Sequence, residues 1–292
     1  MNYTKKIALI GLGSLLLLAS PRANAQTLSQ WTFENDPVAI NNSPAPSSGT
    51  GTSDSIGMNI YATPNVGVTQ DDVLVGKSSD TGANGVADLT NTWRVRGQAG
   101  SNGAANGWSS LAPIGTQGAQ FFVPTTSVAT GAINVSFDWY ATTQGEANLQ
   151  LEYTTNGGTS WNNVALTLGG NDTGLTVLNN SSSANTVTGS YVSDNVLNNG
   201  SKAGQDWFTG LTATINDPNA LNNSGFGIEM VNASTAADDV STQGTALNNS
   251  SGNWRFDNIT VAAVPEPRSW TLAVIVVVAF VGLRRRFAGR VL

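Results

Sequence analysis

The sequence predicts an all-β protein: an antiparallel two-sheet sandwich of jelly-roll type, lying between an N-terminal signal peptide and a single C-terminal membrane helix. Three observations support this prediction. Apolar and polar residues alternate with a period of two in many short runs, clusters of Gly and Asn separate these runs, and no convincing helical stripe lies between the two ends. Many short strands joined by turns are typical of two packed sheets.

The clearest expected strand is INVSFDWYA, residues 133–141, in which apolar side chains fall on one face and polar side chains on the other. One face should pack and the other should be wet. ANLQLEYTT, residues 147–155, repeats the pattern. Two stretches, 41–54 and 169–202, are so polar that we expect them to be surface excursions. Further strands are expected at 28–34, 92–97, 119–124, 162–168, 207–215, 226–231 and 254–263.

The first 25 residues have the layout of a secretory signal peptide. Two lysines precede an apolar stretch over 7–19, and a polar region ends in Ala23-Asn24-Ala25, an A-x-A cleavage site. A signal peptidase would therefore release a mature chain that begins at Gln26. The alternative is a buried helix or a membrane anchor, for which the apolar stretch is short.

The C-terminal part, residues 264–292, combines two prolines, an apolar segment and a basic tail. Pro265 and Pro267 flank Glu266 and keep this stretch extended and accessible to an enzyme. Residues 270–283 contain no charge and are shorter than the roughly 20 residues that span a bilayer comfortably, although flanking side chains extend their reach. The arginines that follow keep this end in the cytoplasm and leave the body outside; they are Arg284, Arg285 and Arg286.

These three elements, in this order, resemble the PEP-CTERM sorting signal, and the match covers about the last tenth of the chain. The resemblance implies recognition by an exosortase, a membrane-embedded cysteine protease or transpeptidase of Gram-negative bacteria that make extracellular polysaccharide. We then expect secretion across the inner membrane, a transient membrane anchor, and a final location at the cell surface or in the extracellular matrix. The alternative is a plain anchor that leaves an inner-membrane anchored periplasmic protein, but this leaves the two prolines unexplained.

Composition excludes several classes of function. The 292 residues include no Cys and no His, which excludes disulfides, thiolate or imidazole metal sites, and Ser-His-Asp or Cys-His catalysis. Residues 26–264 carry 18 acidic and five basic side chains, a net charge of −13, which argues against nucleic acid as a partner. Cations and neutral glycans are the expected partners, and a bound metal would be a hard cation such as calcium.

The first and last expected strands carry the candidate metal ligands. QWTFEN and WRFDNITV resemble the terminal strands of concanavalin-like or galactose-binding-like extracellular β-sandwiches, in which these strands are often neighbours. Glu34 and Asp257 could then meet and hold a calcium ion with backbone carbonyls, or they could be ordinary strand-end carboxylates. TTNGGTSW, residues 154–161, resembles the Asp-box hairpin of sialidase-like propellers, but it occurs once, and its Asn-Gly-Gly suits a tight turn in any fold.

From the sequence we expect that the protein is not an enzyme. Jelly-roll glycosidases place their acids as E-x-D-x-E on one strand, a spacing that is absent here, and Glu152 is alone on its strand. Trp108, in the loop-like SNGAANGWSS, is the best candidate for a glycan contact, although core packing is the commoner role of tryptophan. We therefore expect a structural or adhesive protein linked to extracellular polysaccharide. The alternative is a surface-tethered carbohydrate-binding module or polysaccharide-active enzyme.

Overall fold

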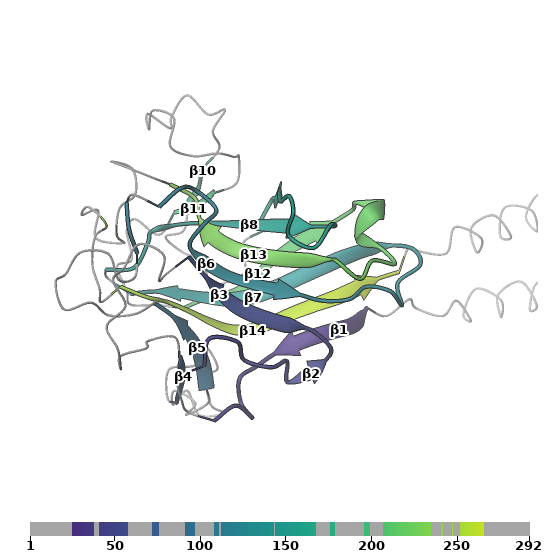
Figure 1. The fold of residues 1–292 in the computed structure, drawn as a ribbon, viewed down its shortest axis with the longest axis horizontal. Coiled ribbons are helices and arrows are strands. Elements are labelled where there is room, and N and C mark those ends of the chain that lie inside the picture. Colours follow the sequence, from purple (N-terminus) through teal and green to yellow (C-terminus); the bar gives the residue numbers. More distant parts are fainter. Residues whose placement is uncertain are drawn as a thin grey trace, which may run out of the picture. The chain divides into compact units, whose positions relative to one another are not determined.

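A computed structural model of the chain describes one compact unit, Gln26–Ala263, with its flanking residues as far as 25 and 265 (Figure 1). Within the described part of the chain, no helix has the length and apolar character needed to cross a membrane. The residues described are 25–37, 41–57, 72–75, 91–96, 108–110, 112–142, 144–167, 176–178, 196–198, 207–234, 241, 247 and 252–265.

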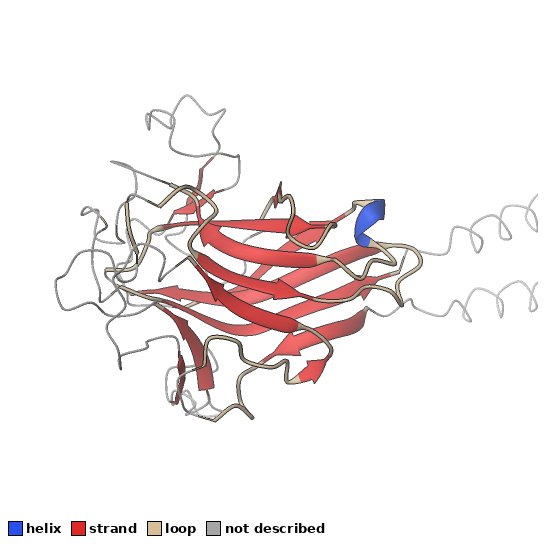
Figure 2. Cartoon of the chain, viewed as in Figure 1, coloured by secondary structure: helices blue, strands red, loops and turns tan. Residues whose placement is uncertain are grey.

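Fourteen strands are present in these residues, and the only helix among them is a short 3-10 turn, Pro218–Ala220 (Figure 2). The strands of the first sheet, sheet A, are β1 (Gln26–Trp31), β2 (Ser48–Gly49), β4 (Asp72–Val75), β5 (Asn91–Val95), β7 (Ala132–Ala141), β12 (Phe208–Ile215) and β14 (Trp254–Val264). The strands of the second, sheet B, are β3 (Thr52–Ile56), β6 (Gly118–Phe122), β8 (Asn148–Thr154), β9 (Asn162–Val164), β10 (Thr176–Leu178), β11 (Val196–Asn198) and β13 (Gly227–Asn232).

Sheet A has the order β12-β7-β14-β1-β2, with β5 paired to β14 and β4 paired to β5, and sheet B has the order β10-β11-β8-β13-β6-β3, with β9 paired to β8. All the strand pairs for which a register is described are antiparallel. From β6 to β8, and again from β12 to β14, successive strands alternate between the sheets (Figure 1). The prediction of an all-β protein with two antiparallel sheets is confirmed.

Strand β14 pairs with β7 on one side, and on its other side with two strands that follow one another along its length. Its C-terminal part pairs with β1, from Trp31–Ile259 to Gln26–Ala263, and its N-terminal part pairs with β5, from Phe256–Trp93 to Trp254–Val95. Asn258 lies between the two paired parts with φ 50°, a left-handed conformation that Asn tolerates better than most residues. The strand thus changes partner where its backbone is irregular.

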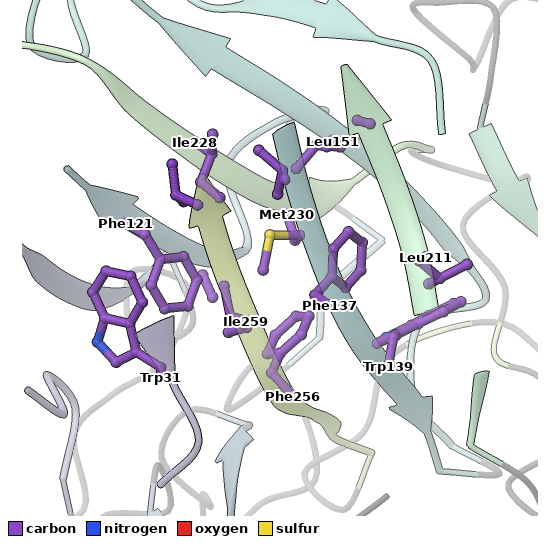
Figure 3. Close-up of a cluster of buried hydrophobic side chains, with 14 of the residues drawn as sticks. Trp31, Phe121, Phe137, Trp139, Leu151, Leu211, Ile228, Met230, Phe256 and Ile259 are labelled. Atoms are coloured by element: carbon purple, nitrogen blue, oxygen red, sulfur yellow. The ribbon is translucent and has the colours of Figure 1, made fainter. Parts of the chain in front are cut away.

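The core lies between the sheets and is rich in aromatic rings (Figure 3). Rings from both sheets meet there: the centroids of Trp31 of β1 and Phe121 of β6 are 4.9 Å apart, in an edge-to-face arrangement that suits their quadrupoles. Met230 of β13 and Ile259 of β14 lie in the same cluster. The alternation of residues 133–141 is confirmed, because Ile133, Val135, Phe137 and Trp139 are all buried.

Three details of the strand predictions are wrong. Residues 169–202, expected to be a surface excursion, include β10 and β11, which pair with one another and extend sheet B beside β8. Residues 41–54 are not only a surface excursion, since they include β2 and most of β3, which pairs with β6 at the edge of sheet B. An edge strand depends on backbone hydrogen bonds more than on apolar side chains. The polar sequence of β3 therefore gave no sign of a strand. The expected wet face of β8 is also buried: Gln150, Glu152 and Thr154 are at most 9% exposed.

Candidate functional site

The described tryptophans fall into a buried group and a half-buried group. Trp108 belongs to the first, with no exposed surface and its ring centroid 4.3 Å from that of Trp254, so the prediction that it is an exposed glycan contact is wrong. Its loop-like sequence context could not show that it packs against a residue far along the chain. Among the described residues, Trp161 and Trp207 are half-buried. The fully buried tryptophans are Trp31, Trp93, Trp108, Trp139 and Trp254.

Trp207 belongs to a row of side chains on the outer face of sheet A, the face opposite the core. Phe208 of β12 pairs with Trp139 of β7, and both are buried, so their neighbours Trp207 and Tyr140 point outwards together. Their ring centroids are 5.6 Å apart at an interplanar angle of 40°. The guanidinium carbon of Arg255, on β14, lies 5.1 Å from the centroid of the Tyr140 ring. We call Trp207, Tyr140 and Arg255 the aromatic row.

Polar side chains surround the aromatic row. Asp138, two residues before Tyr140 and therefore on the same face of β7, accepts hydrogen bonds from Gly210 N at 2.7 Å and from Asn258 Nδ2 at 3.1 Å. Arg94 of β5 is the register partner of Arg255 and lies between two buried residues, so it also points outwards. The face thus combines flat rings with carboxylate, amide and guanidinium groups, which can pack against a sugar ring and hydrogen-bond its hydroxyl groups.

The candidate calcium ligands both lie near the start of β5. Glu34 Oε2 accepts a hydrogen bond of 3.4 Å from Asn91 N. The β5–β14 register, continued by two residues from Phe256–Trp93, places Asn91 beside Asn258, whose backbone N donates to Asp257 Oδ1 at 2.8 Å. In the described residues no group of three or more carboxylates is close enough to hold a metal ion. A calcium site on Glu34 and Asp257 therefore stays a prediction.

The hairpin of residues 154–161 joins β8 to β9 and is organised by its own hydrogen bonds. Thr154 Oγ1 accepts from Asn156 N at 3.2 Å and from Gly158 N at 3.1 Å. Gly157 and Gly158 have φ values of 69° and 84°, which confirms that the Asn-Gly-Gly sequence supplies positive φ to this turn. The hairpin has a sufficient structural role in linking two strands.

The sequence analysis missed a pair of acidic residues on the outer face of sheet B. Glu152 of β8 and Glu229 of β13 are register partners, and their carboxyl groups are hydrogen-bonded to one another. They are 9% and 2% exposed. Two carboxyl groups in direct contact are closer than the roughly 5 Å that separates those of a retaining glycosidase. Glu229 is 77 positions away in the sequence, and only the strand register brings it to Glu152.

The sorting and cleavage residues lie at or beyond the ends of the described chain. Ala25 is exposed and Pro265 half-buried. Ala23, Glu266 and Pro267 lie outside the described residues, as do the predicted membrane segment 270–283 and the basic cluster after it, Arg284, Arg285 and Arg286. The sorting signal is therefore a prediction from sequence alone.

No protein-family model and no curated protein matches the chain. Two solved structures are similar to it, each at 10% sequence identity. One is the Clostridium thermocellum endo-1,4-β-D-xylanase 10B, CBM22-1 and GH10 modules, complexed with xylohexaose; the TM-score is 0.38, and the match covers 83% of this chain and 29% of the xylanase chain. The other is a Bacteroides thetaiotaomicron protein described as sugar-binding, with a TM-score of 0.36 and coverage of 82% and 100%.

Proposed function

We propose that the chain is a secreted surface or matrix protein without catalytic activity, whose β-sandwich binds extracellular polysaccharide through the outer face of sheet A. The observation that carries this proposal is the aromatic row, in which two half-buried rings lie side by side on a face turned away from the core. Rings of this kind offer apolar area together with polar groups at low cost in conformational entropy. Neighbouring Asn258 is half-buried and adds an amide group, which the buried Asp138 supports by accepting from its Nδ2.

Further support comes from the different surroundings of the two half-buried tryptophans. Trp161 lies in the β8–β9 hairpin, with its ring centroid 6.1 Å from that of Phe122 and no arginine described over it. Trp207, just before β12, lies instead among a phenol ring, a guanidinium group and a carboxylate, which belong to the adjacent strands β7 and β14. A sugar chain could cross these strands and meet each of these groups in turn.

Binding to immobilised polysaccharides tests the proposal. Trp207→Ala and Tyr140→Ala should each weaken binding at least tenfold, since each removes a ring from the contact surface, while Trp161→Ala serves as the matched control and should leave it unchanged. Unchanged melting temperatures would show that the variants remain folded. A loss of binding in Trp161→Ala, with normal binding in Trp207→Ala, would contradict the proposed surface.

The proposed delivery rests on the two ends of the sequence. The resemblance to the PEP-CTERM signal supports export by a signal peptidase, processing by an exosortase, and release to the cell surface or matrix. Mass spectrometry of the exported protein should find an N-terminus at Gln26 and no peptide from 270–292. Changing Arg284, Arg285 and Arg286 to Ala should block the C-terminal processing only; normal processing would count against the sorting signal.

We also propose the jelly-roll topology within the sandwich. Its support is that β6, β7 and β8 pass from sheet B to sheet A and back, and that β12, β13 and β14 do the same in the opposite sense. In addition, the first and last strands, β1 and β14, are neighbours in one sheet. This arrangement closes the sandwich with its terminal strands side by side.

A further inference from the structure

A row of oxygen-bearing side chains crosses the outer face of sheet B. The register partners along it are Asp54 of β3, Gln120 of β6, Glu229 of β13, Glu152 of β8 and Asn163 of β9. Residues paired across antiparallel strands share a face. This face is the outer one, because the neighbours of Glu229 along its strand, Ile228 and Met230, both belong to the core. We call it the polar row.

The centre of the polar row is closed off from solvent but has an unused acceptor. Glu229 is 2% exposed, and apart from the hydrogen bond between the two carboxyl groups its Oε1 atom has no partner among the described residues. Glu152 Oε1 accepts a hydrogen bond from Gln150 Nε2. A Cβ built on Gly115 would lie 4.0 Å from Glu152 Oε2, so the turn around Gly115 passes close to the pair. A buried oxygen without a partner outside the pair is costly, and a bound ligand that reached it would remove this cost.

At neutral pH the pair retains a proton. Burial above all, and then the hydrogen bond and the charge of Glu152, raise the pKa of Glu229 to about 9. Burial also raises the pKa of Glu152, although hydrogen bonds with Glu229 and Gln150 oppose this shift. On the described elements beside the pair, β3, β6, β9 and the 112–117 loop, Asp54 is the only other titratable group, and it is exposed. Two adjacent carboxyl groups without a cation therefore share one proton.

We propose that Glu152 and Glu229 form a binding site for a hard divalent cation of the size of calcium. The cation takes the place of the shared proton, which is released to solvent, and the pair then holds it with two carboxylates. Glu229 Oε1 becomes a ligand, and Gln120, the register partner of Glu229 on β6, can add an amide oxygen. Gln150 donates from its Nε2 to Glu152 Oε1, so its amide group would have to turn over to offer its oxygen. Six to eight oxygen ligands, some of them water, satisfy calcium. The site is separate from Glu34 and Asp257 and does not depend on polysaccharide binding.

Calorimetric titration of the exported, mature protein with calcium chloride, in two buffers of different ionisation enthalpy, tests this site. The cation displaces one proton, which the buffer takes up. At pH 7 the apparent binding enthalpies in the two buffers should therefore differ by the difference between the ionisation enthalpies of the buffers, multiplied by about one proton per cation. The affinity should rise up to tenfold per pH unit between pH 6 and 8. Glu229→Gln should lower the affinity at least tenfold, and Glu152→Gln should do the same. Asp54→Asn, the matched control, removes an exposed charge at the end of the same row and should bind as the unchanged protein does.

Each other outcome overturns the proposal. Binding that survives Glu229→Gln but is lost in Asp257→Asn would place the cation at the terminal strands instead. Binding without proton release would show that the pair is not the site. If no binding heat is found from pH 6 to 8, and calcium does not change the melting temperature, the carboxyl pair binds a proton and no cation. Equal affinity for magnesium, which requires a smaller octahedral shell, would contradict a calcium-sized site.

Discussion

The outer faces of the two sheets follow the same alternating pattern of residues but differ in chemistry and in contact with water. On sheet A the outward side chains include Tyr140 and Arg255, which are half-buried and carry a ring and a guanidinium group. On sheet B, Glu152 and Glu229 also point away from the core, yet they are at most 9% exposed. Asp54 and Asn163, at the ends of the polar row, are exposed, so only its centre is closed to solvent. A part of a face in contact with water can receive a sugar chain, whereas a closed part admits a proton or an ion.

The largest expected effect is a difference in stability loss between tryptophans on the inner and outer faces of sheet A. Trp254→Ala should lower the free energy of unfolding by about 3–5 kcal/mol, because the ring is fully buried and packs against Trp108 and Trp139. Trp207→Ala should cost only about 1 kcal/mol, because its ring is half-buried and has Tyr140 as its aromatic partner. Urea denaturation of both variants checks this. Equal losses would show that the aromatic row is part of the structural core.

The next effect concerns the closed face of sheet B and its dependence on pH. The pKa of Glu229 is about 9 in the folded protein and about 4.3 in an unfolded chain. At a pH between these two values, the folded state holds a proton that the unfolded state has released. Stability should therefore fall as the pH rises, by at most about 2.7 kcal/mol between pH 6 and 8. Urea denaturation in the presence of a chelator measures this decrease.

Glu229→Gln is the control for that measurement, because it keeps the shape of the side chain and removes its titration. Its stability should change less between pH 6 and 8 than that of the unchanged protein, and at pH 8 it should be the more stable of the two. If both proteins show the same dependence on pH, the carboxyl pair does not hold a shared proton, and the contrast between the two faces is lost.

A smaller effect is expected from the polar support of the aromatic row. Asp138→Ala removes the acceptor for Gly210 N and Asn258 Nδ2 and should cost about 1–3 kcal/mol, since Asp138 is only 8% exposed. Thermal unfolding and polysaccharide binding measured together give the sharpest result. Binding should weaken more than in Trp161→Ala, because Gly210 and Asn258 flank the rings. Unchanged stability would mean that Asp138 does not organise this face.

The smallest effect should come from Arg255. Its guanidinium group lies 5.1 Å from the Tyr140 ring centroid, and its Nε donates to Asn253 Oδ1 at 3.3 Å. A cation over a half-exposed ring contributes about 0.5–1 kcal/mol, so Arg255→Ala should lower the free energy of unfolding by no more than this. Arg255→Lys should retain part of it. Urea denaturation measures this loss. A loss above 2 kcal/mol would show that the outer face of sheet A is more closely packed than its half-buried side chains indicate.

The sequence predicted the strands well where one face is apolar and the other polar. All nine expected strands are present, β7 with the predicted alternation, because burial of one face imposes a period of two on the residues. The missed strands β2, β3, β4, β10 and β11 are at most five residues long. Such short strands depend on backbone pairing with neighbours, which leaves little trace in their own side chains.

The candidate sites were harder to predict because they depend on contacts between distant residues. Trp108 lies in a polar, Gly-rich segment, yet it is buried against Trp254. Glu152 was correctly seen as the only acid on its strand, but its partner Glu229 comes from another strand and is found only through the register. A sequence shows which side chains a strand presents, whereas pairing decides which of them meet.

The position of β14 has a consequence for the order in which the protein can fold. This strand lies at the centre of sheet A, with β7 on one side and both β1 and β5 on the other. Its pairing with β1 places Ala263 beside Gln26, the first residue of β1. Neither β1 nor β5 can reach its central partner until the ribosome has made the chain as far as Val264. Closing so long a loop is slow and yields no stability until it is complete. Sheet A therefore stays open during synthesis until its central strand has been made.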